Sequence, residues 1–148
     1  MSKLPRPPGH HSITPGFAVP NAVRALEFLQ RAFDGKVVER HDGPGGNIAH
    51  CEVMLGDSVV MFGETMPGSE PMPAMLAYYV DDAAAVDAAY ERALSAGGTP
   101  DRPPANQFYG LRSGTVKDPC GNKWTICAVV EDVSREEILR RMQEMMKG

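Results

Sequence analysis

The chain has 148 residues, of which 43% are hydrophobic, and a formal net charge of -4 at pH 7. This length suits one compact domain or two half-size units that share a core. Its scattered Lys and Arg residues do not form the basic patch that nucleic-acid binding requires, and no apolar run approaches the roughly 20 residues of a membrane span. We therefore expect no nucleic-acid or membrane partner. The N-terminus has no signal-peptide pattern, which predicts a cytoplasmic protein.

The first half of the chain predicts one β-α-β-β-β unit over residues 12–63. A proline-rich arm at residues 1–11 precedes it, and we expect its histidines, His10 and His11, to be solvated. A strand ends before Asn21, a candidate helix N-cap, and apolar residues then recur at helical spacing. The turns "DGPGGN" and "GDS" separate three further strands, "GKVVERH", "IAHCEVML" and "VVMFGE".

The second half predicts the same order of elements over residues 74–130, after a proline-rich linker at 64–73. "MLAYYV" is a strand, Asp81 or Asp82 caps the next helix, and "AGG" ends that helix. An irregular stretch around a broken strand, "TPDRPPANQ", comes next. The strands "FYGLRSGTVK" and "KWTICAVV" complete this unit, and the turn "DPCGN" lies between them.

The two halves align as copies of one module. Val80 falls on Val19 at an offset of 61 residues, and Thr125 falls on Val60 at an offset of 65. The change of offset is a difference in loop length, which a repeat tolerates at little entropic cost. In a unit with four strands and one helix, the helix covers only one face of the sheet, so the other face must be covered by the second unit or must enclose a ligand. We therefore predict a single α+β domain in which two tandem βαβββ modules form a curved mixed sheet around a cleft.

A third helix is predicted at 133–146, after the second module. Ser134 and Glu137 form a capping box at its start. Its apolar stripe consists of Ile138, Met142 and Met145 or Met146. The stripe must pack on its own domain or on a second subunit, and the sequence leaves both arrangements open. We expect a homodimer.

The three cysteines form no CxxC pair, and their odd count argues against a disulfide framework or a zinc knuckle. Cys51 and Cys127 fall on predicted strands, where we expect them to be small apolar core residues. Cys120 falls in the "DPCGN" turn, where we expect it to be exposed.

The repeated β-α-β-β-β order, the "V-x-(D/N)" step into each helix and the "DPCGNKW" turn resemble the vicinal oxygen chelate superfamily. That superfamily includes glyoxalases, bleomycin resistance proteins and extradiol dioxygenases. The resemblance covers residues 12–130. The segment "QFYGLRSGTVKDPCGNKWTI", followed by "EDVSREEILRRM", is most similar to the PhnB-like branch. The resemblance implies a small organic ligand enclosed in a cleft.

Metalloenzymes of this superfamily hold their metal on the first and last strands of each module. The resemblance places Thr14, Val60, Met75 and Thr125 at those positions. Hydroxyl, alkyl and thioether groups are poor ligands for Ni, Zn or Fe beside imidazole and carboxylate. We therefore predict no metal ligands in the chain and no cofactor.

Two ionisable side chains are predicted on one face of the strand "IAHCEVML". His50 and Glu52 alternate with Cys51, Val53 and Leu55, which we expect to meet the helix. An i, i+2 pair lies about 7 Å apart by strand rise, close enough for both side chains to contact one ligand. We assign His50 and Glu52 as a candidate catalytic acid–base pair. The alternative is that they are exposed on an edge strand or satisfy each other.

Further candidate residues come from the second module and from the methionines on predicted strands. The candidate ligand-binding residues are Gln107, Tyr109, Arg112, Trp124, Met61 and Met75. Arg112 suits two-point binding of a carboxylate or phosphate, and methionines suit an adaptable apolar pocket. The alternatives are core packing for the aromatic residues and methionines, and solvent or Glu52 as the partner of Arg112.

These residues support functions from different classes. The missing metal ligands favour a binding protein that sequesters a small molecule, in the manner of bleomycin resistance proteins. The alternative is a lyase or isomerase-type enzyme acting on a small anionic metabolite. In that enzyme His50 is the general base, Glu52 orients it and Arg112 holds the substrate. A third hypothesis is an interaction scaffold. Whether a reaction is catalysed stays open at this point.

Overall fold

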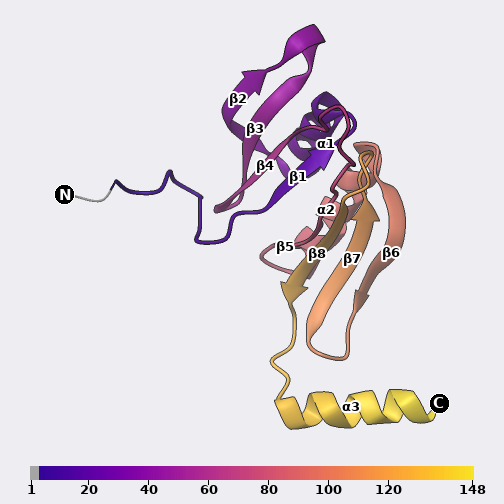
Figure 1. The fold of residues 1–148 in the computed structure, drawn as a ribbon. Helices are drawn as coiled ribbons and strands as arrows, with labels where there is room; N and C mark the ends of the chain where they lie inside the picture. The colour runs from indigo at the N-terminus through magenta and orange to yellow at the C-terminus, as the bar shows by residue number, and fades with distance from the viewer. Residues whose placement is uncertain (1–3) are drawn as a thin grey trace.

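The structure is a computed structural model that describes residues 4–148, so the first residues of the predicted arm lie outside the described part. The first module comprises β1 (Gly16–Val19), α1 (Ala22–Phe33), β2 (Lys36–Asp42), the 3-10 helix η1 (Pro44–Gly46), β3 (Ile48–Leu55) and β4 (Ser58–Glu64). The second comprises β5 (Met75–Tyr79), α2 (Ala83–Ser95), β6 (Thr99–Asn106), β7 (Leu111–Lys117) and β8 (Lys123–Val129), and α3 (Arg135–Lys147) follows it (Figure 1).

Each module forms its own four-stranded mixed sheet, and both sheets have the same strand order. Sheet A has the order β1-β4-β3-β2, and sheet B has the order β5-β8-β7-β6. In each sheet the first strand pairs in parallel with the last, and the other neighbours are antiparallel. This repeated order confirms the predicted fold class, an α+β protein with two βαβββ modules and a C-terminal helix.

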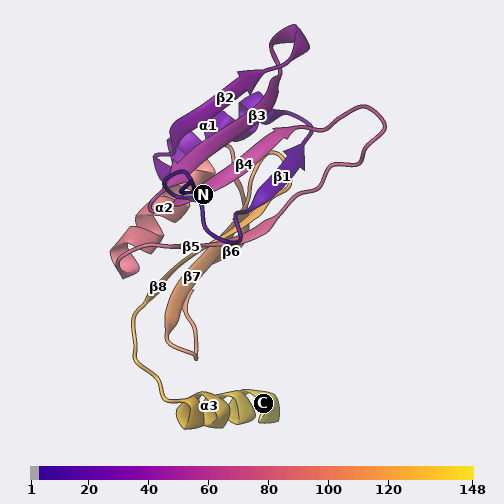
Figure 2. The ribbon, with the colours of Figure 1, turned by 60° about the vertical axis from the view of Figure 1, so that its left-hand side comes forward.

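Helices α1 and α2 lie side by side and join the two modules (Figures 1 and 2). Arg92 of α2 donates from Nε to the carbonyl of Ala32 in α1 (3.3 Å). The ring of Phe33, at the end of α1, lies 4.8 Å from that of Tyr78 and 5.2 Å from that of Trp124, measured between centroids. Because these contacts cross from one module to the other, the modules share one hydrophobic core.

All three predicted N-caps are confirmed. The side chains of Asn21, Asp82 and Ser134 each accept a hydrogen bond from the backbone N–H three residues on, at 3.1, 2.8 and 3.2 Å. Each of these bonds satisfies one of the backbone donors that the first turn of a helix leaves unpaired. The sequence therefore predicts where each helix starts to within one residue.

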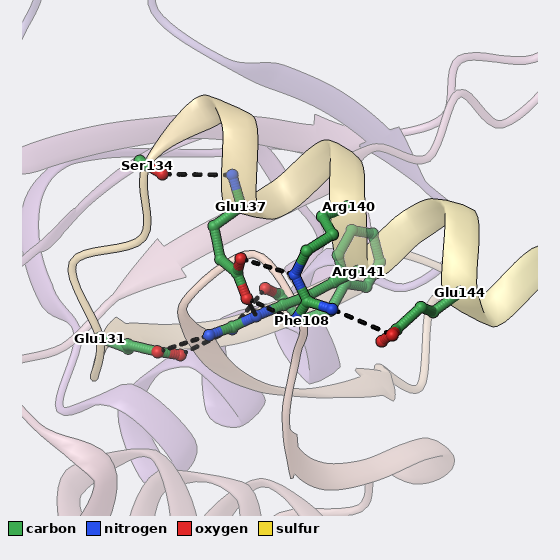
Figure 3. A network of polar contacts seen from close by, with 7 residues as sticks. All are labelled: Phe108, Glu131, Ser134, Glu137, Arg140, Arg141 and Glu144. Atoms are coloured by element: carbon green, nitrogen blue, oxygen red, sulfur yellow. Dashed lines mark hydrogen bonds and ion pairs between the residues drawn. The ribbon is translucent and has the colours of Figure 1, made fainter.

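Helix α3 stands apart from the two sheets (Figures 1 and 2) and is fixed by a network of ion pairs (Figure 3). Arg141 pairs with Glu131 (2.8 Å) and with Glu137 (2.9 Å), and donates to the carbonyl of Phe108 (3.0 Å). Hydrogen bonds from Arg140 and Arg141 lower the pKa of the Glu137 carboxyl to about 2. Because the Glu137 side chain is engaged by these arginines, only the N-cap half of the predicted capping box forms.

Two local predictions are wrong. Residues 99–106 form the continuous strand β6, with register irregularities around Arg102, where a broken strand is predicted. The thiol of Cys120 is buried, and its Sγ donates to the carbonyl of Asn21, where an exposed turn is predicted. Pairing with the next strand, β7, overrides the local signal of the prolines in the first case, and contact with the distant Asn21 does so in the second. No helix in the described part of the chain has the length and hydropathy needed to cross a membrane.

A buried carboxylate holds the turn that precedes β8. Asp118 is only 5% exposed. It accepts hydrogen bonds from the backbone N–H groups of Cys120 and Asn122 (both 2.9 Å), from Nδ2 of Asn122 (2.8 Å) and from Nε1 of Trp124 (3.0 Å). One side chain thus satisfies four donors in and beside the core. The "DPCGNKW" motif is explained by this arrangement.

Replacing Asp118 with Ala should destabilise the protein, because it leaves these buried donors without an acceptor. We expect the free energy of unfolding to fall by about 3 kcal/mol, measured by urea denaturation. Asp57→Ala, in the exposed turn between β3 and β4, is the matched control and should change it by less than about 0.5 kcal/mol. Equal effects of the two substitutions would contradict this account of the turn.

Candidate functional site

Each sheet has one face covered by helices and one face on which no helix packs, and in sheet A the N-terminal arm lies on part of that second face. In sheet A the buried, helix-facing side chains include Phe17, Cys51, Val53, Val60 and Phe62. We call the opposite surface open face A; its side chains are Glu39, His41, His50, Glu52, Met54 and Met61. The corresponding surface of sheet B, open face B, consists of Met75, Ala77, Tyr79, Arg102, Ser113, Thr115, Lys117, Thr125, Cys127 and Val129.

The most polar group of contacts on open face A is centred on Glu52. Its Oε2 lies 2.7 Å from Nε2 of His50, and its Oε1 lies 2.7 Å from Nε2 of His10. His10 belongs to the N-terminal arm, which crosses this face. The side chains of His10 and Glu52 are 14% and 17% exposed, whereas that of His50 is 42% exposed. Two imidazoles therefore share one carboxylate that is largely shielded from solvent.

A second histidine–carboxylate pair lies directly beside the first. His41 and Glu39 of β2 are the cross-strand neighbours of His50 and Glu52, and His41 Nε2 lies 2.9 Å from Glu39 Oε1. The rings of His41 and His50 are 6.2 Å apart between centroids. Together these side chains border a cavity of about 600 Å³, lined by Pro7, Pro8, His10, Val38, Glu39, His41, His50 and Glu52.

The two histidines keep the Glu52 carboxylate ionised. The hydrogen bond from His50 is the largest influence on the pKa of Glu52 and holds it below the usual 4.5. Partial burial opposes this effect, and the hydrogen bond from His10 adds to it. Within residues 4–148, no three His, Cys, Asp or Glu side chains converge in a geometry that could hold a metal ion. The contacts within the cluster are hydrogen bonds between imidazole nitrogens and carboxylate oxygens.

The structure separates the predicted site residues into four places. His50, Glu52 and Met61 lie together on open face A, and Met75 lies on open face B. Gln107 and Tyr109 lie in the turn between β6 and β7, next to Phe108, whose carbonyl binds α3. Arg112 and Trp124 point to the helix side of sheet B. There Arg112 pairs with Asp87 of α2 (2.9 Å), and Trp124 is buried in the core.

The positions at which related metalloenzymes hold a metal do not offer a ligand set. The register of the strands makes Met61 the counterpart of Thr125, because Met61 pairs with Gly16 as Thr125 pairs with Ala77. The predicted counterpart, Val60, is one residue off and is buried on the helix side. The residues at the four positions are then Thr14, Met61, Met75 and Thr125. They supply hydroxyls and thioethers, which do not fit a divalent transition metal.

Sequence reasoning missed three members of the cluster. His10 was expected to be solvated, but it is bound to Glu52 across 42 residues of chain. His41 and Glu39 were not selected, although their alternation on the strand "GKVVERH" is a signal that could have identified them. For His10 no local pattern exists, because an irregular arm has no periodicity that reveals what it contacts.

A second cavity, of about 560 Å³, lies between the modules. Its apolar walls include Ile13, Leu76 and Trp124, and its polar lining includes His11 and Asp81. It holds none of the histidine–carboxylate pairs. We therefore take the Glu52 cluster as the candidate site.

The fold and this site can now be compared with known proteins. The sequence profile of the Glyoxalase/Bleomycin resistance protein/Dioxygenase superfamily matches residues 10–126. An uncharacterized protein of Mycobacterium bovis is 30% identical over 148 residues, which is 93% of this chain and 95% of that one. The chain therefore belongs to the glyoxalase/bleomycin resistance protein/dioxygenase superfamily.

Solved structures are similar in fold. TioX from Micromonospora sp. ML1 has a TM-score of 0.68 and 24% identity, and the match covers 82% of this chain and 100% of that one. A glyoxalase-related enzyme from Fulvimarina pelagi has a TM-score of 0.67 and 20% identity, over 80% of this chain and 87% of that one. These similarities concern the fold alone. The roles of the site residues therefore rest on the geometry of this chain.

Because the pKa of Glu52 is lowered in the folded chain, the stability that this side chain gives the fold depends on pH. A carboxyl whose pKa is lower in the folded than in the unfolded chain stabilises the fold above pH 4.5, and that contribution is lost as the pH falls through the folded value. The difference in free energy of unfolding between wild type and Glu52→Gln should therefore shrink as the pH falls below 4.5.

Urea denaturation at a series of pH values measures this difference. Glu70→Gln, which removes one carboxylate from the exposed linker, is the control for the loss of a single charge. A difference that grows below pH 4.5 would contradict the assigned role of Glu52.

Proposed function

We propose that the protein binds a small organic molecule on open face A, in the cavity beside His50 and Glu52. The observation that carries this proposal is the arrangement of the Glu52 carboxylate: both oxygens are engaged by imidazoles, while Nδ1 of the half-exposed His50 has no partner among residues 4–148. The cavity volume of about 600 Å³ is within the range of small-molecule sites. A fixed carboxylate and a free imidazole nitrogen give such a ligand a defined orientation.

The charge of the cavity favours a neutral or cationic ligand. Glu39 and Glu52 line it, and no Lys or Arg is among the described residues that do so. Arg112, which the sequence analysis assigns to an anionic substrate, lies on the helix side with Asp87. An anion entering this cavity would meet two carboxylates and no Lys or Arg among the described lining residues.

A second candidate function, an acid–base enzyme, is favoured by the same geometry. If Glu52 holds the proton on Nε2 of His50, Nδ1 of that ring carries the lone pair and faces the ligand as a general base. This is the relation of an orienting carboxylate to a catalytic histidine. The reaction class it suits is proton abstraction in a lyase or isomerase, with a neutral or cationic substrate.

Replacing His50 with Gln distinguishes these functions, using neutral and cationic compounds selected by thermal-shift screening. For an enzyme, turnover should fall by about 100-fold or more while affinity changes little, because the proton acceptor is lost. For a binding protein, affinity should fall by about fivefold, the effect of one hydrogen bond, and neither protein should form product. His11→Gln, outside the cavity, is the control. A ligand whose affinity and turnover are both unaffected by His50→Gln would overturn the assignment of the site.

We also propose that the protein is a homodimer in which open face B of one copy covers open face A of the other. Three apolar side chains of open face B are well exposed: Met75 is 80%, Tyr79 62% and Val129 65% exposed. Apolar sheet faces of soluble proteins are normally covered. Lys117 and Arg102 on this face complement the carboxylates of open face A, and a twofold arrangement would give two equal sites.

Light scattering after size-exclusion chromatography tests the dimer. Wild type should elute with twice the 16.0 kDa chain mass. Tyr79→Glu places a negative charge opposite the carboxylates of open face A and should weaken association by about tenfold or more. Ser69→Glu, in the exposed linker, should not. A monomeric wild type at 100-fold the concentration used for binding would exclude this arrangement.

Within the superfamily, we assign the chain to the PhnB-like branch as part of this proposal. The support is the turn 118–124, which the Asp118 network holds, followed by the capped helix α3. The methionines of α3, Met142, Met145 and Met146, are also exposed.

A further inference from the structure

Both ring nitrogens of His10 face hydrogen-bond acceptors. Nε2 lies 2.7 Å from Oε1 of Glu52, and Nδ1 lies 3.2 Å from the carbonyl oxygen of Pro8. A carboxylate only accepts hydrogen bonds, so Nε2 of His10 is the donor in its contact with Glu52. His50 differs, because only its Nε2 is engaged.

We propose that His10 is a positioning residue of the site: by donating a hydrogen bond to Glu52, it fixes that carboxylate and thereby holds His50 in the tautomer with its proton on Nε2. The inference rests on the proposed function of the cavity. With His10 on Oε1, the carboxylate cannot rotate without losing a charge-assisted hydrogen bond, so Oε2 stays aimed at His50. The N-terminal arm thus sets which nitrogen of His50 is presented to the ligand.

The backbone of the arm brings His10 to this position. The carbonyl of Gly9 accepts a hydrogen bond from the N–H of Val59 (2.9 Å), and the carbonyl of Pro15 accepts one from the N–H of Met61 (2.9 Å). Gly9 has a φ of 80°, and a Cβ placed there would lie 2.5 Å from Cε of Met54. Only glycine fits both the left-handed backbone and the close approach. Gly9 is therefore what allows His10 to reach Glu52.

The charged and titratable groups around His10 come from two strands. Glu52 and His50 face it from β3, and Glu39 and His41 line the same cavity from β2. Glu39 is paired with His41, which leaves Glu52 as the carboxylate that His10 contacts. From β4, the side chain nearest this cluster in the sheet register is the uncharged Met61. Among residues 4–148, Glu52 is the carboxylate that contacts His10.

Nuclear magnetic resonance of protein with 15N-labelled histidine tests this proposal without any ligand. The ring nitrogen shifts report the proton on each nitrogen of His10 and His50. In wild type we expect neutral His50 to be predominantly in the tautomer with its proton on Nε2. In His10→Gln the population ratio of the Nε2–H tautomer of His50 to its Nδ1–H tautomer should fall by about fivefold. This is the effect expected from the loss of one ordinary hydrogen bond. His11→Gln, at the neighbouring arm position, should leave the ratio unchanged.

Two further variants exclude a merely structural effect. Gly9→Ala displaces the arm while keeping His10, and should reproduce the His50 change of His10→Gln. Glu52→Gln should lower the ratio by itself, and adding His10→Gln to it should have no further effect. The proposal is overturned if His10→Gln leaves the His50 tautomer ratio unchanged, as His11→Gln should. Because no ligand is needed, failure of ligand binding or turnover is observed separately and bears only on the proposed function.

Discussion

The packing of α1 against α2 is the constraint on which the rest of the structure depends. Each module has one helix for four strands, so it can cover one face of its sheet. Because the helices pack on each other, and Phe33 contacts Tyr78 and Trp124 across the junction, the helix sides of both sheets are buried in one core. The opposite face of each sheet then has no helix packed on it, and in sheet A only the N-terminal arm lies there. Every polar group proposed here to act on a ligand lies on one of these faces.

The two open faces differ in chemistry although their modules are copies. The position of Glu52 on open face A corresponds by register to Thr115 on open face B, and that of His50 to Ser113. The first module thus carries carboxylate and imidazole where the second carries hydroxyls. Such a division suits two faces that meet across a dimer, with one supplying the acid–base groups and the other an apolar and basic cover. The duplication supplies the scaffold, and the substitutions between the copies supply the site.

Most of the fold follows from local signals in the sequence, and part of the site does as well. Helix caps and the alternation of strand residues are local, so Asn21, Asp82 and the pairing of His50 with Glu52 are predictable. Two kinds of fact are not local. The contact of His10 with Glu52 spans 42 residues and depends on an aperiodic arm. The face on which a strand residue lies depends on register. A shift of one residue exchanges Val60 for Met61 as the counterpart of Thr125. Arg112 faces helix α2, whereas the sequence places it in a ligand-binding cleft.

The central claim is that open face A, with its histidine–carboxylate cluster, is where a small molecule binds. The four histidines make this directly measurable, because His10, His41 and His50 line the site and His11 lies in the cavity between the modules. Histidine ring resonances should be recorded while neutral and cationic organic compounds are added. The account predicts that a compound that binds shifts the resonances of His10, His41 and His50 and leaves that of His11 unchanged. A compound that binds and shifts only His11 would contradict it.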